Sequence, residues 1–459
     1  MTRFAVVGAG PASLSFLWAL MLLGRRDISI DVFYSEDYAH AEIINEGQEW
    51  GVDETNRVAG LGGGLKKWGS LVSTMPTYLS GNNGFSTFIE NKYAFAANDF
   101  YDTKLPSIET SEREHFFWTV TGGFDFKKKI SVLRKYFGSK IRFLKRSVWE
   151  IKQYKDASTL IFIGGEESDT YDEVLLACGA IENQRLLVQS GFLRGRVRIS
   201  DHPKTDLAIL SVEATRAKDL KKYFGVLHKG VARFSAVNIS DLGYFRLYPV
   251  HSWAGKLNLL RYVAWITRSR FIKSRKLSLL DEYESEITSL RCAEFSVVET
   301  LKYILARLNL YVPHVRRIKV RYVLSDQQNK IEFALKRRGD FESTLTQFGA
   351  EIDVRTLSMI KLELPKLVEE LERKTGIIVN SVHPLNRIEW QSASHHIGSS
   401  RDYRQAVNDP VMLRKASPSK NRPWVLGTMG LETSGFINPG YQLACVSAYL
   451  ADILSTIYE

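Results

Sequence analysis

The sequence predicts an α/β fold that combines a parallel sheet with a second, mostly antiparallel sheet. Three observations predict it. The chain begins with the pattern of a buried strand, a glycine turn, an apolar helix and a second strand, an order typical of parallel sheets. Alternating polar and apolar stretches follow between about 205 and 252, as expected for strands with one wet face. An apolar helix is expected to close the chain at 441–457.

The apolar run from Phe4 to Leu23 resembles a signal peptide or a membrane span, because about 20 apolar residues cross a bilayer. Its glycines favour another interpretation. They predict a strand at 4–7, a tight turn at 8–13, a buried helix at 14–23 and a second strand at 28–34.

The predicted turn has the glycine spacing of a dinucleotide-binding site and consists of Gly8, Ala9, Gly10, Pro11, Ala12 and Ser13. Gly8 permits the turn, and Gly10 lets the backbone approach a pyrophosphate. The small Ser13, in place of the usual third glycine or alanine, keeps helix and strand close. The phosphates are then expected at the N-terminus of the helix.

An acidic residue at the end of the second strand would accept hydrogen bonds from the ribose hydroxyls of such a ligand. Glu36 stands at that place, whereas Asp31 lies in the middle of the predicted strand and is the weaker candidate. The turn and the carboxylate do not choose between NAD and FAD.

Two later segments bear on that choice. The first is the glycine-rich loop 60–70, which contains Gly63, Gly64, Trp68 and Gly69 and suits a backbone that passes close to a flat ring or a diphosphate. Its simpler interpretation is a mobile loop. The second is a buried strand entering a small-residue turn at 170–180, with Ala177 and Gly179, followed by a helix from 181 to 187.

The middle of the chain predicts further strands and helices. Strands are expected at 231–237 and 244–250, and the strand at 331–335 is expected to continue the same sheet. Helices are expected at 277–289, 293–308 and 357–374.

Composition is that of an ordinary globular protein long enough for two closely associated domains, with 459 residues, 44% hydrophobic and 25% charged. The three cysteines are far apart and lack metal-ligand spacing, so we expect no disulfide framework, no metal site and a reducing cytoplasm. The net charge of +11 indicates attraction to an acidic partner without naming it.

Taken in order along the chain, the motifs resemble the glucose-methanol-choline (GMC) oxidoreductases. They are the N-terminal glycine turn, the loop ending in Trp68-Gly69, the stretch 176–183, Asp201-His202-Pro203, the stretch 395–401 and the stretch 433–439. The matches span nearly the whole chain, with residues 204–390 matching only loosely.

The resemblance implies a discontinuous Rossmann-type FAD-binding domain, formed by residues 1–203 and 391–459, around an inserted α+β substrate domain at 204–390. His395 matches the active-site histidine of the family. Asn438 matches its second catalytic position and, with Pro439, contacts the flavin. Covalently flavinylated members carry their linkage on a histidine in the glycine-rich loop, and this loop has none, so we expect noncovalent FAD.

The implied reaction is oxidation of an alcohol by an oxidase or dehydrogenase, with a sugar, polyol or glycosylated metabolite as substrate. A C–H bond can leave as hydride only as the O–H proton is removed, and a neutral imidazole suits that task. We therefore assign His395 as the general base and Asn438 as the donor that positions the oxygen. His396 is expected to have a supporting or structural role. The sequence does not choose between O2 and a quinone as electron acceptor.

Departures from the family pattern leave alternatives open. Gly427 stands where many members have an aspartate, Asp402 where methionine is common, and the short chain predicts an open active site. One alternative is an FAD protein of other chemistry, a monooxygenase or an isomerase. The other is a membrane-associated flavoprotein that has lost turnover.

Two basic stretches, 261–276 and 316–321, motivate the membrane alternative. Their simplest interpretation is a solvated face. An anionic membrane surface or a phosphorylated sugar would also match their charge. No recognised nucleic-acid-binding module accompanies them, so nucleic acid is not expected. The predicted location is the cytoplasm, with peripheral membrane association as the alternative.

Overall fold

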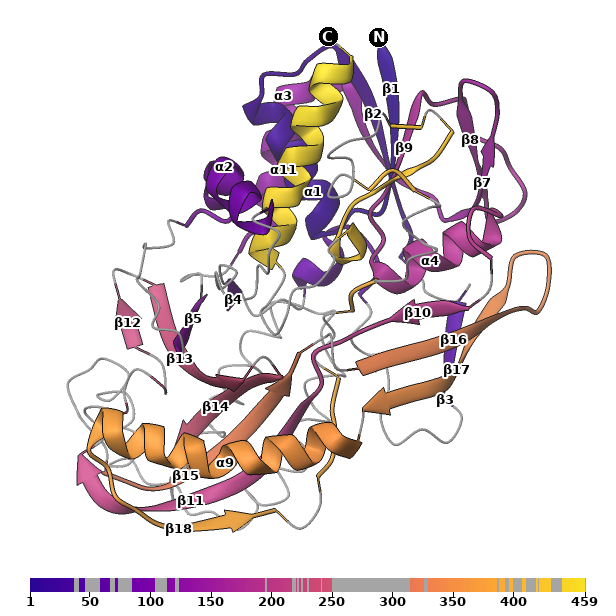
Figure 1. Ribbon diagram of the computed structural model, residues 1–459. Helices are drawn as coiled ribbons and strands as arrows, with labels where there is room; N and C mark the ends of the chain where they lie inside the picture. Colours follow the sequence, from indigo (N-terminus) through magenta and orange to yellow (C-terminus); the bar gives the residue numbers. More distant parts are fainter. Residues whose placement is uncertain are drawn as a thin grey trace, which may run out of the picture.

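The computed structural model shows the described part of the chain as four sheets and their covering helices (Figure 1). It describes residues 1–36, 41–45, 58–66, 71–72, 85–103, 114–119, 124–194, 196–216, 220, 223, 226–228, 231–240, 242–249, 314–325, 329–352, 354–385, 388–392, 396–398, 407–409, 418–419, 421–430 and 440–458. The expected helices at 277–289 and 293–308, and the basic stretch 261–276, lie outside these residues.

The N-terminal unit forms the centre of a five-stranded parallel sheet with the strand order β19-β9-β1-β2-β6. Its strands are β1 (Thr2–Val7), β2 (Ile28–Tyr34), β6 (Ile141–Lys145), β9 (Glu173–Leu176) and β19 (Trp424–Val425). Both β1 and β9 confirm the predicted strands, and β2 has the predicted bounds. The edge strand β19 comes from the C-terminal part of the chain, so distant segments complete one sheet.

Helices cover both faces of this sheet because successive strand residues point to opposite sides. Phe4 and Val6 of β1 join one apolar core, whereas Ala5 and Val7 join another. The first core is formed with α1 (Pro11–Leu22), α2 (Phe85–Phe100), α3 (Phe126–Phe137) and α11 (Gly440–Ile457). In Figure 1 the yellow α11 runs alongside the indigo α1. The closing helix is confirmed.

The second core lies under α4 (Ala180–Gln189) and the hairpin of β7 (Val148–Gln153) and β8 (Ser158–Phe162). The predicted helix after Gly179 is thereby confirmed. This core continues into a four-stranded sheet with the order β10-β16-β17-β3. Its strands are β3 (Ala41–Asn45), β10 (Val197–Ile199), β16 (Asn329–Arg337) and β17 (Ser343–Ile352).

One predicted pairing is wrong. The stretch 331–335 is a strand, but β16 pairs with β10 and β17 and does not continue the larger antiparallel sheet. Its apolar side chains Ile331 and Phe333 pack with Val197 and Ile199, next to the parallel sheet. Alternation predicts a strand, but it does not name the neighbour with which that strand pairs.

The largest sheet is antiparallel at every pairing within the described residues, with the order β18-β11-β15-β14-β13-β5-β4 and β12 paired to β13. Its strands are β4 (Leu71–Val72), β5 (Glu114–Thr119), β11 (Lys204–Arg216), β12 (Val226–His228), β13 (Val231–Ser240), β14 (Gly243–Pro249), β15 (His314–Leu324) and β18 (Val379–Pro384). The predicted strands near 231 and 244 are confirmed. The domain boundaries at 203 and 390 stay a prediction.

The long helix α9 (Val354–Thr375), predicted at 357–374, covers one face of the antiparallel sheet (Figure 1). Ile360, Leu367 and Leu371 of α9 pack with Phe245 and Val320 of the sheet. Within the described part of the chain, no helix combines the length and the apolar composition that a bilayer crossing requires.

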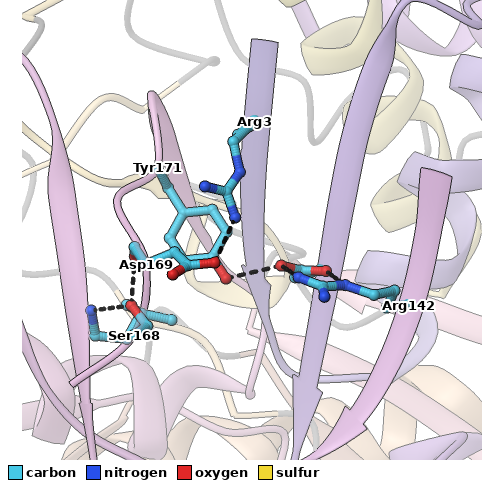
Figure 2. A network of polar contacts seen from close by, with 7 residues as sticks. Arg3, Arg142, Ser168, Asp169 and Tyr171 are labelled. Carbon is cyan, nitrogen blue, oxygen red and sulfur yellow. Dashed lines mark hydrogen bonds and ion pairs between the residues drawn. The ribbon is translucent and has the colours of Figure 1, made fainter. Parts of the chain in front are cut away.

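A buried carboxylate links three segments of the parallel sheet region (Figure 2). Asp31 of β2 accepts hydrogen bonds from Arg142 of β6, at 2.6 Å to each oxygen, and from the Tyr171 hydroxyl at 2.8 Å. Its side chain is 3% exposed, against 54% for Arg142. Figure 2 shows the Arg3 guanidinium near the Tyr171 ring, 5.2 Å from its centroid. Because Arg142 and Tyr171 occupy the Asp31 carboxylate, Asp31 is a poor candidate for contacting a ribose. Its place in the middle of a strand already made it the weaker candidate.

We predict that Asp31→Asn lowers the free energy of unfolding by about 1–3 kcal/mol, because a charged hydrogen-bonding partner is removed from a buried site. The matched control is Asp169→Asn, since Asp169 forms an ion pair with Arg3 but is 71% exposed. The control should cost less than about 0.5 kcal/mol. Urea unfolding of both variants measures the difference, and equal losses would contradict the structural role of Asp31.

Candidate cofactor and active site

The glycine turn follows β1 and requires glycine at its first position. Gly8 has a φ of +110°, and a β-carbon there would lie 2.4 Å from the carbonyl oxygen of Ala177. Gly10 differs, because the nearest atom to its β-carbon position is the same oxygen at 4.0 Å. The backbone of Gly10 therefore borders open space, as the close approach of a pyrophosphate requires.

Helix α1 begins at Pro11, three residues earlier than predicted, so Pro11, Ala12 and Ser13 form its first turn. Proline suits this place because its fixed φ fits a helix and it has no N–H to leave unbonded. No side chain caps this N-terminus, and its first turn has no acidic residue. The partial positive charge of the helix end is thus available to an anion.

The glycine-rich loop closes over this turn. The Gly62 N–H donates to the Ala9 carbonyl at 2.8 Å, and a β-carbon at Gly63 would lie 3.0 Å from the Cα of Gly10. Gly63 has a φ of +45°, whereas nothing lies within 4 Å of the β-carbon position of Gly64. The structure therefore brings Gly63 together with Gly10. Trp68 and Gly69 lie outside the described residues.

Glu36 lies two residues after the end of β2, at the carboxyl edge of the parallel sheet. Its carboxylate forms an ion pair with Lys145 at 2.5 Å, and its Cγ lies 3.8 Å from the β-carbon position of Gly60. The Lys145 contact lowers the pKa of Glu36, with a smaller effect from Lys66. Glu36 is therefore an exposed, ionised carboxylate beside the glycine-rich loop, suited to accept hydrogen bonds from ribose hydroxyls.

Two more strands of the parallel sheet end beside the turn. Ala177 follows β9 and donates its N–H to Val7 at 2.7 Å, and Gly179 precedes α4 with a φ of +92°. Gly427 follows β19 with a φ of +106°, and its β-carbon position is 3.7 Å from the Cβ of Ala12. The sequence marked Gly427 only as a departure from a family pattern. The structure shows that the backbone conformation at this position favours glycine, and that the position lies next to the first turn of α1.

The two predicted catalytic residues, His395 and Asn438, lie outside the described residues, as does Pro439. Their chain neighbours are described. His396 lies 3.9 Å from the buried carboxylate of Asp201, measured from Nε2 to Oδ2. Gly440 begins α11, and its carbonyl accepts a hydrogen bond from Tyr101 at 2.8 Å. No sequence signal predicted that Asp201 and His396 approach each other.

The parallel sheet, the glycine turn and the helix that follows it have the arrangement of a Rossmann-type fold. No family model and no curated protein matches the sequence. The chain is similar in structure to pyridoxine 4-oxidase from Mesorbium loti, with 10% sequence identity, 99% of each chain covered and a TM-score of 0.53. This likeness shows that the two chains share a fold over almost their whole length.

Two further structures align over almost the whole chain at lower TM-scores. One is an FAD-dependent oxidoreductase from Chaetomium thermophilum, with 11% identity, 100% of both chains covered and a TM-score of 0.46. The other is a formate oxidase from Aspergillus oryzae, with 12% identity, 100% of this chain and 99% of that chain covered and a TM-score of 0.47.

We predict that Gly10→Val weakens FAD binding at least 10-fold, about 1.4 kcal/mol, while the protein still folds. The structure has room for a β-carbon at this position, but the valine side chain would occupy the space needed by the pyrophosphate. The control Gly339→Val adds the same side chain where nothing lies within 4 Å, on the β16–β17 hairpin. Titration of the apoproteins with FAD, followed by flavin fluorescence, measures both affinities. Unchanged affinity in Gly10→Val would reject the assigned phosphate site.

Proposed function

We propose that the chain is an FAD-dependent oxidoreductase that oxidises an alcohol to a carbonyl. The observation that carries this proposal is the closed arrangement of the Gly8–Gly10 turn, the Gly63 loop and the uncapped end of α1, which is suited to a diphosphate. The likeness to pyridoxine 4-oxidase over 99% of both chains supports the choice of an oxidase-type flavoprotein over other dinucleotide-binding proteins.

The described residues fit FAD. The backbone at Gly10, Ala12 and Ser13 would hold the diphosphate from the helix end, with Gly63 and Gly64 on its other side, and Glu36 would hold the ribose. The other proposed cofactor contacts are Pro11, Trp68, Gly69, Ala177, Gly179, Asn438 and Pro439. When bound, FAD supplies the acceptor for a hydride.

The reaction follows from the chemistry of an alcohol. His395 takes the O–H proton, while Asn438 donates a hydrogen bond to the oxygen and holds it in place. The hydrogen then leaves the carbon as hydride, with the electron pair of the C–H bond, and a C=O double bond forms. Asn438 cannot take the proton, so the two residues have different roles.

The proposed substrate is a sugar, polyol or glycosylated metabolite. The likeness to pyridoxine 4-oxidase adds pyridoxine, an aromatic alcohol, to the compounds worth testing. Anaerobic mixing of the FAD-bound protein with a panel of these alcohols tests the proposal. Bleaching of the flavin absorbance supports it, and no bleaching by any of them counts against it. Reoxidation of the reduced protein by O2 or by a quinone then identifies the acceptor.

A peripheral association with an anionic membrane is a second proposal for the basic residues. On β15, Arg316 and Arg317 are exposed. Lys319 and Arg321 instead form ion pairs with Asp206, at 3.1 and 2.6 Å. Successive residues of a strand point to opposite faces, so Arg316 and Arg317 do not share one lipid-facing surface. The alcohol oxidation is the better supported function.

We predict that acid precipitation of the purified yellow protein releases intact FAD into the supernatant. The reason is that the glycine-rich loop at 60–70 contains no histidine that could form a covalent linkage. Absorbance and mass spectrometry of the supernatant measure the release. Yellow colour that stays with the precipitate would show covalent attachment.

We predict that His395→Ala slows flavin reduction by the alcohol about 10²-fold or more while FAD stays bound, because a positioned base is lost. The variant should also lose the rise in rate with pH near the imidazole pKa of about 6.5. Asn438→Ala should slow the reaction but keep that rise, since an amide does not titrate. Anaerobic stopped-flow measurement, normalised to bound FAD, gives these rates.

The control for this experiment is His383→Ala, an exposed histidine on β18 that contacts Ser381 and Ser211. It should leave the rate unchanged. A merely structural His395 would lower stability or FAD content, with the rate per bound flavin close to that of the unmodified protein. That result would reject His395 as the base.

A further inference from the structure

The segment that leads to His395 is held by the segment between β10 and β11. Ser200 and Ile397 form an antiparallel bridge with N–H to carbonyl distances of 2.8 and 2.9 Å. Lys204 and Gln391 form a second such bridge, at 2.8 and 2.9 Å. Asp201, His202 and Pro203 thus lie between two fixed points on their own segment.

Asp201 lies in this interval with a carboxylate that is 0% exposed. Its Oδ1 accepts from the backbone N–H of His202 at 2.7 Å, and its Oδ2 accepts from the Ser392 hydroxyl at 2.5 Å. The same Oδ2 lies 3.9 Å from Nε2 of His396. One buried carboxylate therefore contacts Ser392 and His396, which flank residues 393–395 in the sequence.

Asn329, the first residue of β16, fixes the backbone that carries this carboxylate. Its side-chain oxygen accepts from the Asp201 N–H at 3.0 Å. Its side-chain nitrogen donates to the Asp201 carbonyl at 2.7 Å and to the Ser325 carbonyl at 3.2 Å. Asp201 therefore cannot turn away without breaking contacts to a second sheet.

We propose that Asp201 is a positioning residue for the proton-removal step, because it holds Ser392 and His396, which flank the proposed base His395 in the sequence. The proposal rests on the proposed function for the role of His395. Burial of a carboxylate is unfavourable unless its contacts compensate, and here those contacts are directed at Ser392 and His396. A base displaced by about 1 Å can lose about 10²-fold in rate, so its support matters to the reaction.

The test compares Asp201→Asn with Asp31→Asn, a matched change at an equally buried carboxylate in the parallel sheet. Asparagine keeps the size of the side chain and one acceptor oxygen. If that oxygen accepts from the His202 N–H, an NH2 group replaces the acceptor of the Ser392 hydroxyl. The charge beside His396 is removed. The probe is the alcohol of the panel that reduces the flavin of the unmodified protein fastest.

Asp201→Asn should lower the limiting rate of flavin reduction per bound FAD by about 10- to 100-fold. The half-saturating alcohol concentration should change by less than about threefold, because the substrate contacts remain. Asp31→Asn should leave both values unchanged while it lowers stability. An unchanged limiting rate in Asp201→Asn would overturn the proposal, whatever happens to stability.

Ser392→Ala is the second variant, in case Asp201→Asn does not fold. It removes one hydroxyl and leaves the carboxylate in place, so a smaller loss of rate is expected. In the double variant the two losses should overlap, because both break the same contact. Full additivity of the two losses would overturn the coupling through Asp201.

Hydrogen exchange provides a readout that needs no turnover. The amides of Gln391 and Ile397 donate to Lys204 and Ser200, so a peptide covering 388–398 should exchange faster in both variants, with α1 unchanged. Unchanged exchange would overturn the proposal. If no alcohol reduces the flavin, the proposed function fails, and faster exchange of this peptide would still support Asp201 as its anchor.

Discussion

Gly8 lies so close to the Ala177 carbonyl that a β-carbon would be 2.4 Å from its oxygen, and the rest of the candidate site depends on this approach. It lets β1 end against β9, and the chain then turns directly into α1. The same turn receives the Gly62 N–H from the glycine-rich loop and places Ala12 beside Gly427. A side chain at Gly8 would separate these segments, so one absent β-carbon allows four parts of the sequence to meet.

The elements that the sequence predicted well are those whose pattern is local. Glycine spacing and apolar runs placed β1, β2, β9, α4 and α11, because their period and breakers lie within a few residues of each other. The start of α1 was set three residues late. Pro11 was interpreted as part of the turn, although proline at the first position of a helix is favourable. The expected ribose carboxylate, Glu36, does stand at the edge of the sheet beside the loop.

The remaining differences concern pairings between distant residues. Alternation identified β16 as a strand but not its partners β10 and β17. The Asp201 cluster was not predicted for the same reason, because its contacts join residues separated by 128 and 191 positions. A single sequence carries no signal for such contacts, because aspartate, asparagine and serine also occur in ordinary turns. His395 and Asn438 stay predictions that follow from the family resemblance.

The place of β19 at the edge of the parallel sheet has a consequence for synthesis of the chain. Trp424 of β19 donates to Glu173 of β9 at 2.8 Å across 251 residues. Translation proceeds at about 5–20 residues per second, so the ribosome needs roughly 12–50 s to pass from one to the other. During that interval the outer edge of β9 has not yet received its native neighbour. An open strand edge pairs readily with other chains, so the nascent protein is most exposed to aggregation before its last segment is made.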